Sequence, residues 1–501
     1  MTYLLGLDIG TTSVKACIYD EHSRIVARAT RPTPVTCPQP YWAEHDPELL
    51  WAGVVESIQS ALQQLPQPHS LAAVAVASMG EAGVPLDSHG QPVFPIITYY
   101  DTRANAYVEF WQSRIDAVKA HAISGQIIRP PFGVMKLLWL RDHHPSLFQR
   151  TQYWLSVGDY ILYRLAGVYA TDYSLASRTM LLDQRNRQWS QELLSIAEIP
   201  KDMFPNVYPS GSQIGGISAT AAAQTGLLVG LPVVTGGHDH LCGALAVGVT
   251  EPGQALVSFG TAAAFIAPDS TFHGGGQSFL HNLSNYCHVA RDRYITQGGL
   301  SAAGGALAWL AELLQADSTV YDHLDAAASA SPPGARGLVW LPYLRGSGTP
   351  QRKATDRAAL VGLRESHTAG DIWRAKLESL AYWSRHTTEA IEQATDRPIQ
   401  QLTLIGGVAK SRIFPQILAD ATDREVLLSP VVEAGACGAA HLAGQAVGIT
   451  MAPPVPTQSV TPHSRSAAHY TRIYDEVYLP LAVVLQPINN TLETIAYESD
   501  V

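Results

Sequence analysis

Apolar runs near the start of the chain are separated by short polar turns. Residues 3–9, 14–19 and 24–29 have the composition and length of β-strands, and Gly10-Thr11-Thr12-Ser13 separates the first two of them. In a P-loop the glycine-rich segment opens a helix instead, and Gly-x-x-x-x-Gly-Lys-Ser/Thr occurs nowhere in the chain. The pattern therefore predicts a strand, a glycine turn and a second strand, without the most common nucleotide-binding motif.

A helix and a further strand follow this opening. Asp46-Pro47-Glu48 places a capping side chain before a proline at the first turn, and the apolar side chains from Leu50 to Leu62 share one helical face. Residues 72–77 form the next apolar strand. Strands that alternate with helices in this way are typical of a mixed α/β sheet flanked by helices.

The second half of the chain repeats the opening pattern. Residues 255–265 run from an apolar strand through Gly260-Thr261 into a second strand, and the turn Glu251-Pro252-Gly253 comes just before them. We therefore expect an internal duplication, with an N-terminal lobe at residues 1–248, a C-terminal lobe at residues 249–501 and a cleft between them.

The last part of the chain contains further strand and helix signals. An amphipathic helix is predicted from Asp371 to about Ile391, and residues 402–405 form a short buried strand that ends at the turn Gly406-Gly407. Helices are predicted at residues 410–419 and 433–440. The second of these consists of small residues, so it can approach another backbone closely.

Composition indicates a globular enzyme. At about 150 residues per domain, a length of 501 residues predicts two to four domains. Hydrophobic residues make up 46% of the chain and charged residues 15%, which is atypical of disordered proteins. The formal net charge is -10, and no run of Lys or Arg is present, so we expect no nucleic-acid partner.

Cysteine usage and the apolar segments predict a cytoplasmic location. The five cysteines are scattered and form no Cys-x-x-Cys pair, which disfavours a disulfide framework or a zinc site. The start has no basic region, and Asp8 interrupts its apolar run before a signal peptide could form. Residues 217–237 could span a bilayer by length, but they are rich in Ala, Thr and Gly and contain Pro232, so we expect a buried strand at their end and no membrane contact.

The two glycine–threonine turns carry the groups that bind an oligophosphate. Such turns expose backbone N–H groups and hydroxyls together, and two of them facing each other would bind ATP. Asp8 directly precedes the first turn, where its carboxylate could hold Mg²⁺ through water, and Lys15 is the nearest cation for phosphate. Either turn alone is equally consistent with a tight hairpin that binds nothing.

A candidate general base follows another apolar strand. Gly236-Gly237-His238-Asp239-His240 comes after Val233-Val234, so Asp239 is expected at a strand end, where clefts form. Phosphoryl transfer to a hydroxyl needs a carboxylate that accepts the proton. Strand alternation predicts His238 and His240 on one face and Asp239 on the other, and no third ligand is evident, so a metal site at the histidines is disfavoured.

Polar residues beyond two apolar runs are candidates for binding sugar hydroxyls. They are Glu81, in Met79-Gly80-Glu81-Ala82-Gly83, and Asp101 with Arg103, in Tyr99-Tyr100-Asp101-Thr102-Arg103. A polyol needs several charged partners, and an analogue that lacks one hydroxyl would leave a buried group unpaired. By position alone, each of these residues is more often a surface or ion-pair residue.

Together these segments resemble the FGGY carbohydrate kinases, a branch of the superfamily of actin, hexokinase and the heat-shock chaperone ATPases. The similarity runs from about residue 3 to residue 445. It rests on the following segments: residues 6–15, which are similar to the first phosphate motif; Ser258-Phe259-Gly260-Thr261, similar to the second; residues 406–411, similar to the adenosine motif; and residues 159–167, 171–180 and 341–346, similar to other family blocks.

The resemblance implies a fold, an activity and roles for individual residues. It implies two ribonuclease-H-like lobes, the first binding most of the sugar and the second most of the ATP. Asp239 matches the catalytic aspartate. The nucleotide contacts of the family match Gly10, Thr11, Thr12, Lys15, Gly260, Thr261, Gly406, Gly407, Ala409 and Lys410. The metal position of the family matches Asp8, and its substrate positions match Glu81, Asp101, Arg103 and His240.

The acceptor is less clearly indicated than the reaction. Residues 79–82 and His240 depart from the patterns of both xylulose and glycerol kinases, and a ketopentose such as D-xylulose is the leading hypothesis. Alternatives are another polyol or sugar acid, such as glycerol, gluconate or L-fuculose. The chain could also be an ATP-driven switch like actin, but Glu81, Asp101 and Arg103 favour a kinase. A binding protein that has lost catalysis is a third possibility, against which the presence of Asp8 and Asp239 argues. A homodimer is the default expectation for a soluble enzyme.

Overall fold

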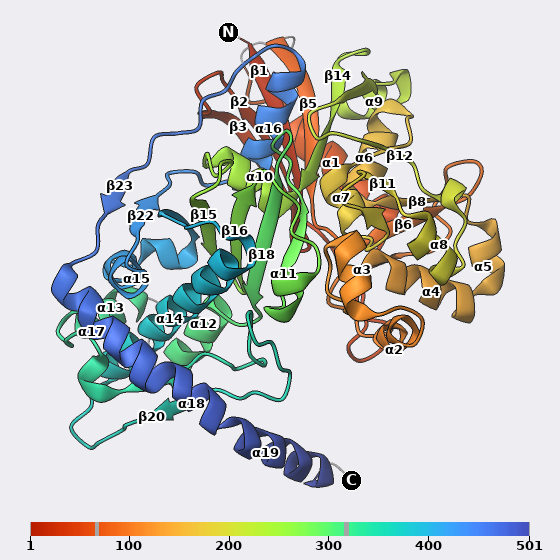
Figure 1. The fold of residues 1–501 in the computed structure, drawn as a ribbon. Helices are drawn as coiled ribbons and strands as arrows, with labels where there is room; N and C mark the ends of the chain where they lie inside the picture. Colours follow the sequence, from red (N-terminus) through yellow and green to blue (C-terminus); the bar gives the residue numbers. More distant parts are fainter. Residues whose placement is uncertain (1, 66–69, 315–319, 500–501) are drawn as a thin grey trace.

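The computed structural model of the chain describes residues 2–65, 70–314 and 320–499. Two lobes, each built around a mixed β-sheet, lie side by side (Figure 1). The N-terminal segments, coloured red to yellow, form one lobe, and most of the green to blue segments form the other. The α/β architecture and the two lobes predicted from the sequence are confirmed.

The first sheet has three antiparallel strands, continued by two parallel strands and an antiparallel edge strand. In spatial order it reads β13-β14-β5-β1-β2-β3, and β1 pairs antiparallel with β2 and parallel with β5. Its strands are β1 (Tyr3–Ile9), β2 (Ser13–Tyr19), β3 (Ile25–Pro32), β5 (Leu71–Ser78), β13 (Gln213–Gly216) and β14 (Pro232–His238).

The second sheet repeats this plan. It reads β17-β18-β16-β15-β21-β22-β23, and β15 pairs antiparallel with β16 and parallel with β21. The corresponding pairings in both sheets confirm the predicted internal duplication. Its strands are β15 (Gln254–Phe259), β16 (Ala263–Asp269), β17 (Ser284–Cys287), β18 (Tyr294–Leu300), β21 (Gln401–Gly406), β22 (Glu425–Leu428) and β23 (Gln458–Val460).

Short strand pairs lie outside the two sheets. They are β4 (Glu44–His45) with β7 (Ile96–Ile97), β6 (Gly83–Leu86) with β8 (Tyr153–Ser156), β9 (Ala170–Asp172) with β12 (Asn206–Tyr208), β10 (Leu182–Asp183) with β11 (Gln188–Trp189), and β19 (Val339–Leu341) with β20 (Ala359–Val361).

Helices cover both sheets. Those of the first half are α1 (Pro47–Leu62), α2 (Tyr107–Gln112), α3 (Ala117–Ser124), α4 (Gly133–His143), α5 (Pro145–Arg150), α6 (Val157–Ala166), α7 (Tyr173–Ser177), α8 (Gln191–Ala197), α9 (Ala219–Thr225) and α10 (Asp239–Ala246). Those of the second half are α11 (Gly276–Leu280), α12 (Gly304–Leu313), α13 (Val320–Ser329), α14 (Ala369–Thr395), α15 (Phe414–Thr422), α16 (Ala434–Ala446), α17 (Ser464–Ile473), α18 (Leu479–Val484) and α19 (Gln486–Ser499).

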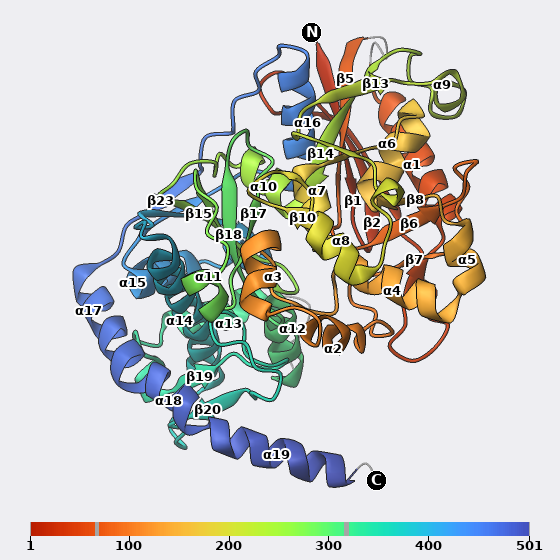
Figure 2. The same ribbon diagram turned by 45° about the vertical axis from the view of Figure 1, so that its right-hand side comes forward.

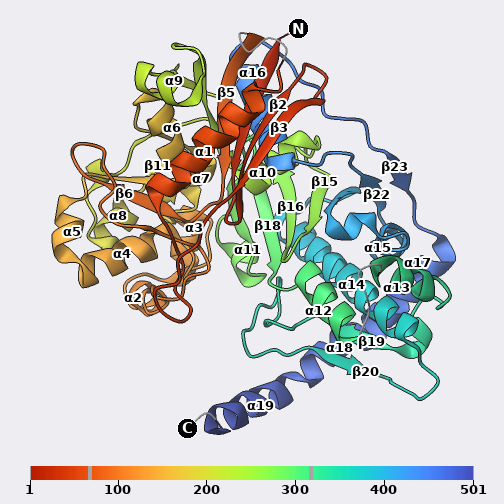
Figure 3. The ribbon, with the colours of Figure 1, turned by 180° about the vertical axis from the view of Figure 1, so that it is seen from behind.

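Alternate side chains of the first sheet pack into two different hydrophobic cores, one on each face of the sheet. Leu5 and Leu7 of β1 face α1 and α6, and α1 crosses the outer side of the sheet in Figure 3. Leu4 of β1 and Ala75 of β5 face the other way, toward α10 and α16. This period of two is what a strand buried on both faces requires.

The helices α10 and α16 fill the space between the two sheets. Their core includes Ala75 from the first sheet and Leu256 and Ile266 from the second. A Cβ at Gly438 of α16 would lie 1.9 Å from the carbonyl oxygen of Cys242 in α10, and one at Gly6 of β1 would lie 1.9 Å from that of Ala436. The small residues of α16 therefore allow three backbones to pack in direct contact.

The lobes also touch at one edge of the second sheet. His121 of α3 accepts a hydrogen bond from the Gly275 N–H at Nδ1 (2.7 Å), and its Nε2 lies 2.8 Å from the carbonyl oxygen of Leu283. The Asn285 N–H of β17 donates to the Gly125 carbonyl at 2.7 Å. These bonds hold α3 beside α11 and β17, as Figure 2 shows.

Several sequence-based element predictions are confirmed, with shifted ends. Asp46 caps α1 by accepting from the N–H groups of Glu48 and Leu49. The helix predicted from Lys410 begins at Phe414, because residues 407–410 form a 3₁₀ turn and Pro415 occupies the first turn of the helix. Residues 217–237 end in the predicted strand, β14.

The boundary predicted near residues 247–253 separates two sequence halves that are intertwined in space. The α16 helix comes from the second half, but it packs on β1, β5 and β14 of the first sheet. None of the described helices is both long and apolar enough to cross a membrane. All five cysteines are free thiols, four of them buried.

Substituting Gly438 tests the contact between α10 and α16. We expect Gly438→Ala to lower the free energy of unfolding by about 1–3 kcal/mol, because the added methyl group must push the two helices apart. Urea denaturation of the purified protein measures this change.

The matched control is Gly243→Ala on α10. There the added Cβ meets only the Ala434 Cβ, at an ordinary 3.5 Å, and alanine favours the helix. This variant should therefore be as stable as the wild type or more stable. Equal destabilisation by both substitutions would contradict the close-packing argument.

Candidate active site

A cavity of about 430 Å³ lies in the cleft between the lobes. It brings together most residues predicted for the reaction, although they are far apart in the sequence. From the first half it is lined by Asp8, Gly10, Thr11, Thr12, Lys15, Glu81, Arg129, Arg178, Asp239 and His240, and from the second by Asn282, Gln297, Thr349 and Arg352, among others.

The first glycine turn forms one wall of this cavity. β1 and β2 pair in register up to Ile9 and Val14, and the Gly10 N–H donates to the Ser13 carbonyl at 3.0 Å. Thr12 is exposed and Thr11 half-buried, so the turn faces the cleft between two strands, as the sequence predicts. Backbone and hydroxyl donors in such a turn are suited to phosphate oxygens.

Asp8, beside this turn, lies close to one positively charged side chain and to other carboxylates. Its Oδ2 is 3.8 Å from Lys15 Nζ, which also lies 2.8 Å from Glu433 Oε2. Burial, together with the negative charges of Asp239 and Glu433, raises the pKa of Asp8 to about 7, and the charge of Lys15 opposes this increase. A Cβ at Gly435, in the first turn of α16, would lie 3.0–3.1 Å from the Asp8 carboxylate, so a small residue is needed there.

Asp239 is the first residue of α10, directly after the last residue of β14. Its Oδ1 accepts from the His240 N–H at 2.6 Å and lies 3.3 Å from His238 Nε2. The side chain is 26% exposed to the cleft. Burial raises the pKa of Asp239 and so does the charge of Glu81, whereas His240 and Arg178 lower it. The predicted strand-end location is confirmed.

The expected separation of Asp239 from the two histidines was wrong. The strand ends at His238, so the alternation of strand side chains does not continue, and the rings of His238 and His240 stack at 5.3 Å. Donor atoms of all three residues lie within 4.8 Å of one another, a grouping that could hold a metal ion. The hydrogen bond from His240 and the contact with His238 already engage Oδ1 of Asp239.

Glu81 projects into the cavity from a left-handed backbone conformation, with φ of 61°. Both its side chain and its partner Arg178 are largely buried, and Arg178 Nε donates to Glu81 Oε1 at 2.9 Å. A Cβ at Gly80 would lie 2.9 Å from Arg178 Cγ, so glycine is required for this approach. In the sequence, Arg178 lies within residues 171–180, a block similar to the family, but nothing in that block indicates its pairing with Glu81.

Asp101 and Arg103 do not line the cavity, in contrast to the prediction. The Asp101 carboxylate accepts from Arg103 Nε at 2.9 Å and from Nη2 at 2.7 Å, and Arg103 Nη1 donates to Glu44 at 2.6 Å. The Arg103 guanidinium also packs 4.0 Å from the Trp42 ring. Both side chains are fully buried, so their polar atoms support the loop rather than a ligand.

A second cavity, of about 500 Å³, lies within the second lobe. Its lining includes Gly260 of the second turn, Gly407 and Lys410 of the predicted adenosine motif, and apolar side chains from Phe259, Leu307, Trp373, Leu377 and Val408. Thr261 lines a neighbouring cavity of about 230 Å³ instead. Gly406 and Ala409 belong to the same motif but line neither of these two cavities. A Cβ at Gly406 would lie 2.4 Å from the Phe259 carbonyl oxygen, so this glycine lets the two strands meet.

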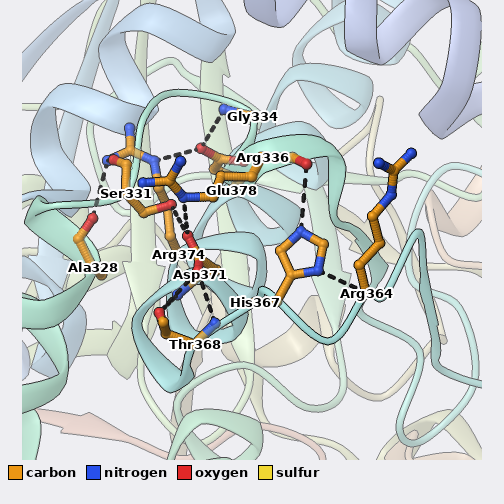
Figure 4. A network of polar contacts seen from close by, with 10 residues as sticks. All are labelled: Ala328, Ser331, Gly334, Arg336, Arg364, His367, Thr368, Asp371, Arg374 and Glu378. Atoms are coloured by element: carbon orange, nitrogen blue, oxygen red, sulfur yellow. Dashed lines mark hydrogen bonds and ion pairs between the residues drawn. The ribbon is translucent and has the colours of Figure 1, made fainter.

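A buried polar network fixes the helix that provides Trp373 and Leu377. Figure 4 shows Asp371 and Glu378 of α14 at its centre. Asp371 accepts from the Thr368 N–H and from Ser331 Oγ, and Glu378 accepts from Arg374 Nε at 2.8 Å. These bonds cap the start of α14 and tie it to the loop after α13.

Two arginines of the cleft were missed because no sequence pattern distinguishes them. Arg129 has a buried Nε without a hydrogen-bond acceptor, and its side chain forms no ion pair within the described part of the chain. Arg352 lies across the cavity, and burial lowers its pKa. Guanidinium groups of this kind are suited to carboxylate or phosphate ligands.

Comparison with family models assigns both halves of the chain. The model described as the FGGY family of carbohydrate kinases, N-terminal domain, matches residues 3–246. The corresponding C-terminal domain model matches residues 255–447. Together the two models span most of the chain.

Individual relatives agree with this assignment. The chain is 30% identical over 494 residues to a xylulose kinase of Escherichia coli K12, covering 95% of this chain and 99% of that protein. It is 32% identical over 463 residues to a glycerol kinase of Acidovorax ebreus, covering 90% and 91%. The crystal structure of xylulose kinase from Rhodospirillum rubrum matches with a TM-score of 0.88 at 31% identity, covering 97% of this chain and all of that one.

The electrostatic coupling of Asp8 and Asp239 can be measured directly. We expect Asp239→Asn to lower the pKa of Asp8 from about 7, because it removes a neighbouring negative charge, and Lys15→Met to raise it. NMR titration of carboxyl-¹³C-labelled aspartate follows both shifts. An Asp8 pKa that stays the same in Asp239→Asn would show that the two groups do not interact.

Proposed function

The chain belongs to the FGGY family of carbohydrate kinases, ATP-dependent phosphotransferases, and we propose that its acceptor is a small sugar, with a ketopentose such as D-xylulose as the first candidate. The names of the xylulose kinase relatives support this acceptor. The proposal for the site itself rests on one observation. A single cavity is lined by the first glycine turn, Asp8, Asp239 and Glu81.

We propose that Asp239 is the general base. A hydroxyl bound between Asp239 and the terminal phosphate of ATP would give its proton to the carboxylate as the new P–O bond forms and the bond to ADP breaks. The raised pKa of Asp239 suits this role, because a stronger base accepts the proton more readily once it is ionised. Closure of the cleft would exclude water and limit wasteful hydrolysis of ATP.

The remaining proposed contacts divide between phosphate, nucleoside and sugar. Gly10, Thr11, Thr12, Lys15, Gly260 and Thr261 would bind the phosphates, and Gly406, Gly407, Ala409 and Lys410 the adenosine. For Lys15 to bind phosphate, its ion pair with Glu433 must open. Glu81 and His240 would bind the sugar, whereas the buried Asp101 and Arg103 would only support the site.

The residues around Asp8 fit a divalent cation. The negative charges of Asp239 and Glu433 both raise the pKa of Asp8 there. Such a cluster is stabilised by positive charge. We propose that Asp8 holds Mg²⁺, which would neutralise charge on the transferred phosphate.

The first test is the base itself. We expect Asp239→Asn to lower kcat on the order of 10²–10⁴-fold, because the amide cannot accept the proton, while ATP affinity changes little. Coupled ADP-release assays over ketopentoses, ketohexoses, aldonates and polyols measure kcat, and calorimetry measures ATP binding. Unchanged turnover in this variant would remove Asp239 from the mechanism.

A specific observation favours sugar acids as a second candidate acceptor class. The Arg129 guanidinium lines the sugar side of the cavity, in the loop that carries Phe132, against which Arg178 packs at 5.2 Å. Arg129 is half-buried, and its buried Nε has no acceptor; a buried N–H donor without a partner is costly unless a ligand pairs with it. The carboxylate of an aldonate would satisfy the guanidinium with two hydrogen bonds.

Arg129→Gln distinguishes these acceptor classes. If the acceptor is a sugar acid, kcat/KM for it should fall about 10–200-fold, the effect of losing a hydrogen bond between charged groups. Turnover of a neutral ketopentose should stay nearly the same. The control is Arg185→Gln, an exposed arginine outside the cavity lining. Failure of the wild type to phosphorylate any acid would exclude the second candidate.

Two further expectations from the sequence are retained as proposals. We propose a cytoplasmic enzyme, since its nucleotide substrate is abundant there and its cysteines are free thiols. We also propose a homodimer, which sedimentation velocity at micromolar concentration would test.

A further inference from the structure

The carboxylate of Asp325 joins three walls of the second-lobe cavity, the cavity of about 500 Å³ described above. Asp325 lies on α13 and is only 5% exposed. Its Oδ1 accepts from the indole Nε1–H of Trp373 on α14 at 2.8 Å, and its Oδ2 accepts from the backbone N–H of Arg412 at 3.0 Å. Arg412 directly follows the predicted adenosine motif, residues 406–411. A single side chain therefore ties together α13, α14 and the end of that motif.

Both donors to Asp325 are neutral N–H groups. Within residues 2–65, 70–314 and 320–499, Asp325 takes part in no ion pair. The ion pair nearby joins the exposed side chains of Asp322 and Arg412, at 4.0 Å. Hydrogen bonds to a charged acceptor are stronger than those between neutral groups, but a buried carboxylate without a cation is still costly. Apolar packing at this place would favour folding more, so the two bonds indicate a role in shaping the cavity.

Trp373 forms an apolar wall of the same cavity. Its side chain is buried, and its ring meets the Tyr321 ring edge to face, with 5.6 Å between the ring centroids. Leu377, one turn further along α14, continues this wall. The indole N–H is the polar edge of the Trp373 ring, and a buried donor that loses its acceptor is unfavourable. Without Asp325, the indole would gain by turning its N–H toward water in the cavity, which would move the ring out of the wall.

We propose that Asp325 is a positioning residue for the nucleoside of ATP, because it fixes both the Trp373 ring and the end of the adenosine motif in the walls of this cavity. The inference rests on the proposed function, in which the adenosine motif binds the nucleoside. Apolar aromatic walls suit the flat faces of a nucleobase. Since protein donors already engage both oxygens of Asp325, it acts on the nucleoside through Trp373 and the Arg412 N–H.

Substitution of Asp325 separates nucleotide affinity from catalysis. In Asp325→Ala we expect the Kd of ADP, measured by calorimetry, to rise about 10-fold, because two hydrogen bonds to a charged acceptor are lost. KM for ATP should rise by a similar factor, whereas kcat at saturating ATP should stay within about twofold of the wild type, because the groups proposed for phosphate transfer line the other cavity. Asp325→Asn keeps one acceptor oxygen but turns an NH₂ group toward the second donor, so its Kd should lie between the two.

The matched control is Asp420→Ala in α15 of the same lobe. Asp420 is also 5% exposed, and its Oδ1 accepts from the His463 N–H at 2.7 Å and from Gln416 Nε2 at 2.8 Å. It lines neither the second-lobe cavity nor the cavity of the cleft. The control loses a comparable pair of bonds, so it should be less stable to urea and still bind ADP like the wild type. Equal weakening of ADP binding in both variants would overturn the proposal.

A double-mutant cycle tests whether Asp325 acts through the indole. Trp373→Phe keeps an aromatic ring in the wall and removes the N–H. In this background, Asp325→Ala should weaken ADP binding less than it does in the wild type. The control for the smaller ring is Trp340→Phe, since Trp340 is buried in the same lobe and its Nε1 has no hydrogen-bond acceptor in the described chain. Independent, additive effects of the Asp325 and Trp373 substitutions would contradict the proposal.

The bond between Asp325 and Trp373 can also be observed without nucleotide. In ¹⁵N-tryptophan-labelled protein, the indole signal assigned through Trp373→Phe should exchange slowly with solvent, and it should shift and exchange faster in Asp325→Asn. This measurement does not depend on the proposed function. A wild type that does not bind ADP would defeat the proposed function together with this inference. A wild type that binds ADP no more tightly than Asp325→Ala, or an unprotected Trp373 indole, would defeat this inference alone.

Discussion

The packing of α10 against α16 is the constraint on which the arrangement of the site depends. The two helices lie between the sheets, and their backbones touch because Gly438 has no side chain. Each helix also begins at the cavity of the candidate site. α10 starts with Asp239, and Gly435 in the first turn of α16 borders the Asp8 carboxylate. One close-packed helix pair therefore sets the spacing of the carboxylates and of the two sheets.

The cleft departs from the charge balance found elsewhere in the molecule. Ion pairs satisfy Arg103 and Arg374 in the two lobes. In the cleft, by contrast, Asp8 and Glu433 share Lys15, and Arg129 forms no ion pair within the described chain. Charged side chains without enough partners of opposite charge lower the stability of the folded protein. They are typical of cavities in which a charged ligand pairs with them.

The sequence predicted the elements better than it predicted which side chains meet. Apolar periodicity and glycine turns located β1, β2, β15 and β16, because strand formation depends on local pattern. Asp101 and Arg103 were assigned to the substrate, yet they pair with each other. An ion pair and a ligand contact use the same residue types, and only tertiary packing separates them. His238 was expected to lie opposite Asp239 because the point where a strand gives way to a helix is uncertain by a few residues. No pattern in the surrounding sequence distinguishes Arg129 and Arg352. What distinguishes them is that neither forms an ion pair within the described residues, and this depends on tertiary packing.

The hydrogen bonds between α3 and the edge of the second sheet restrict how the two halves can move. The lobes are joined at the α10–α16 pair and again where His121 and Gly125 meet Gly275, Leu283 and Asn285. Further bonds continue this contact along the same sheet edge, where the Cys287 N–H and the Tyr294 hydroxyl both donate to Gln184. The two halves therefore meet along a seam rather than at a point, and any displacement that widened the cleft would either preserve this seam or break hydrogen bonds along it.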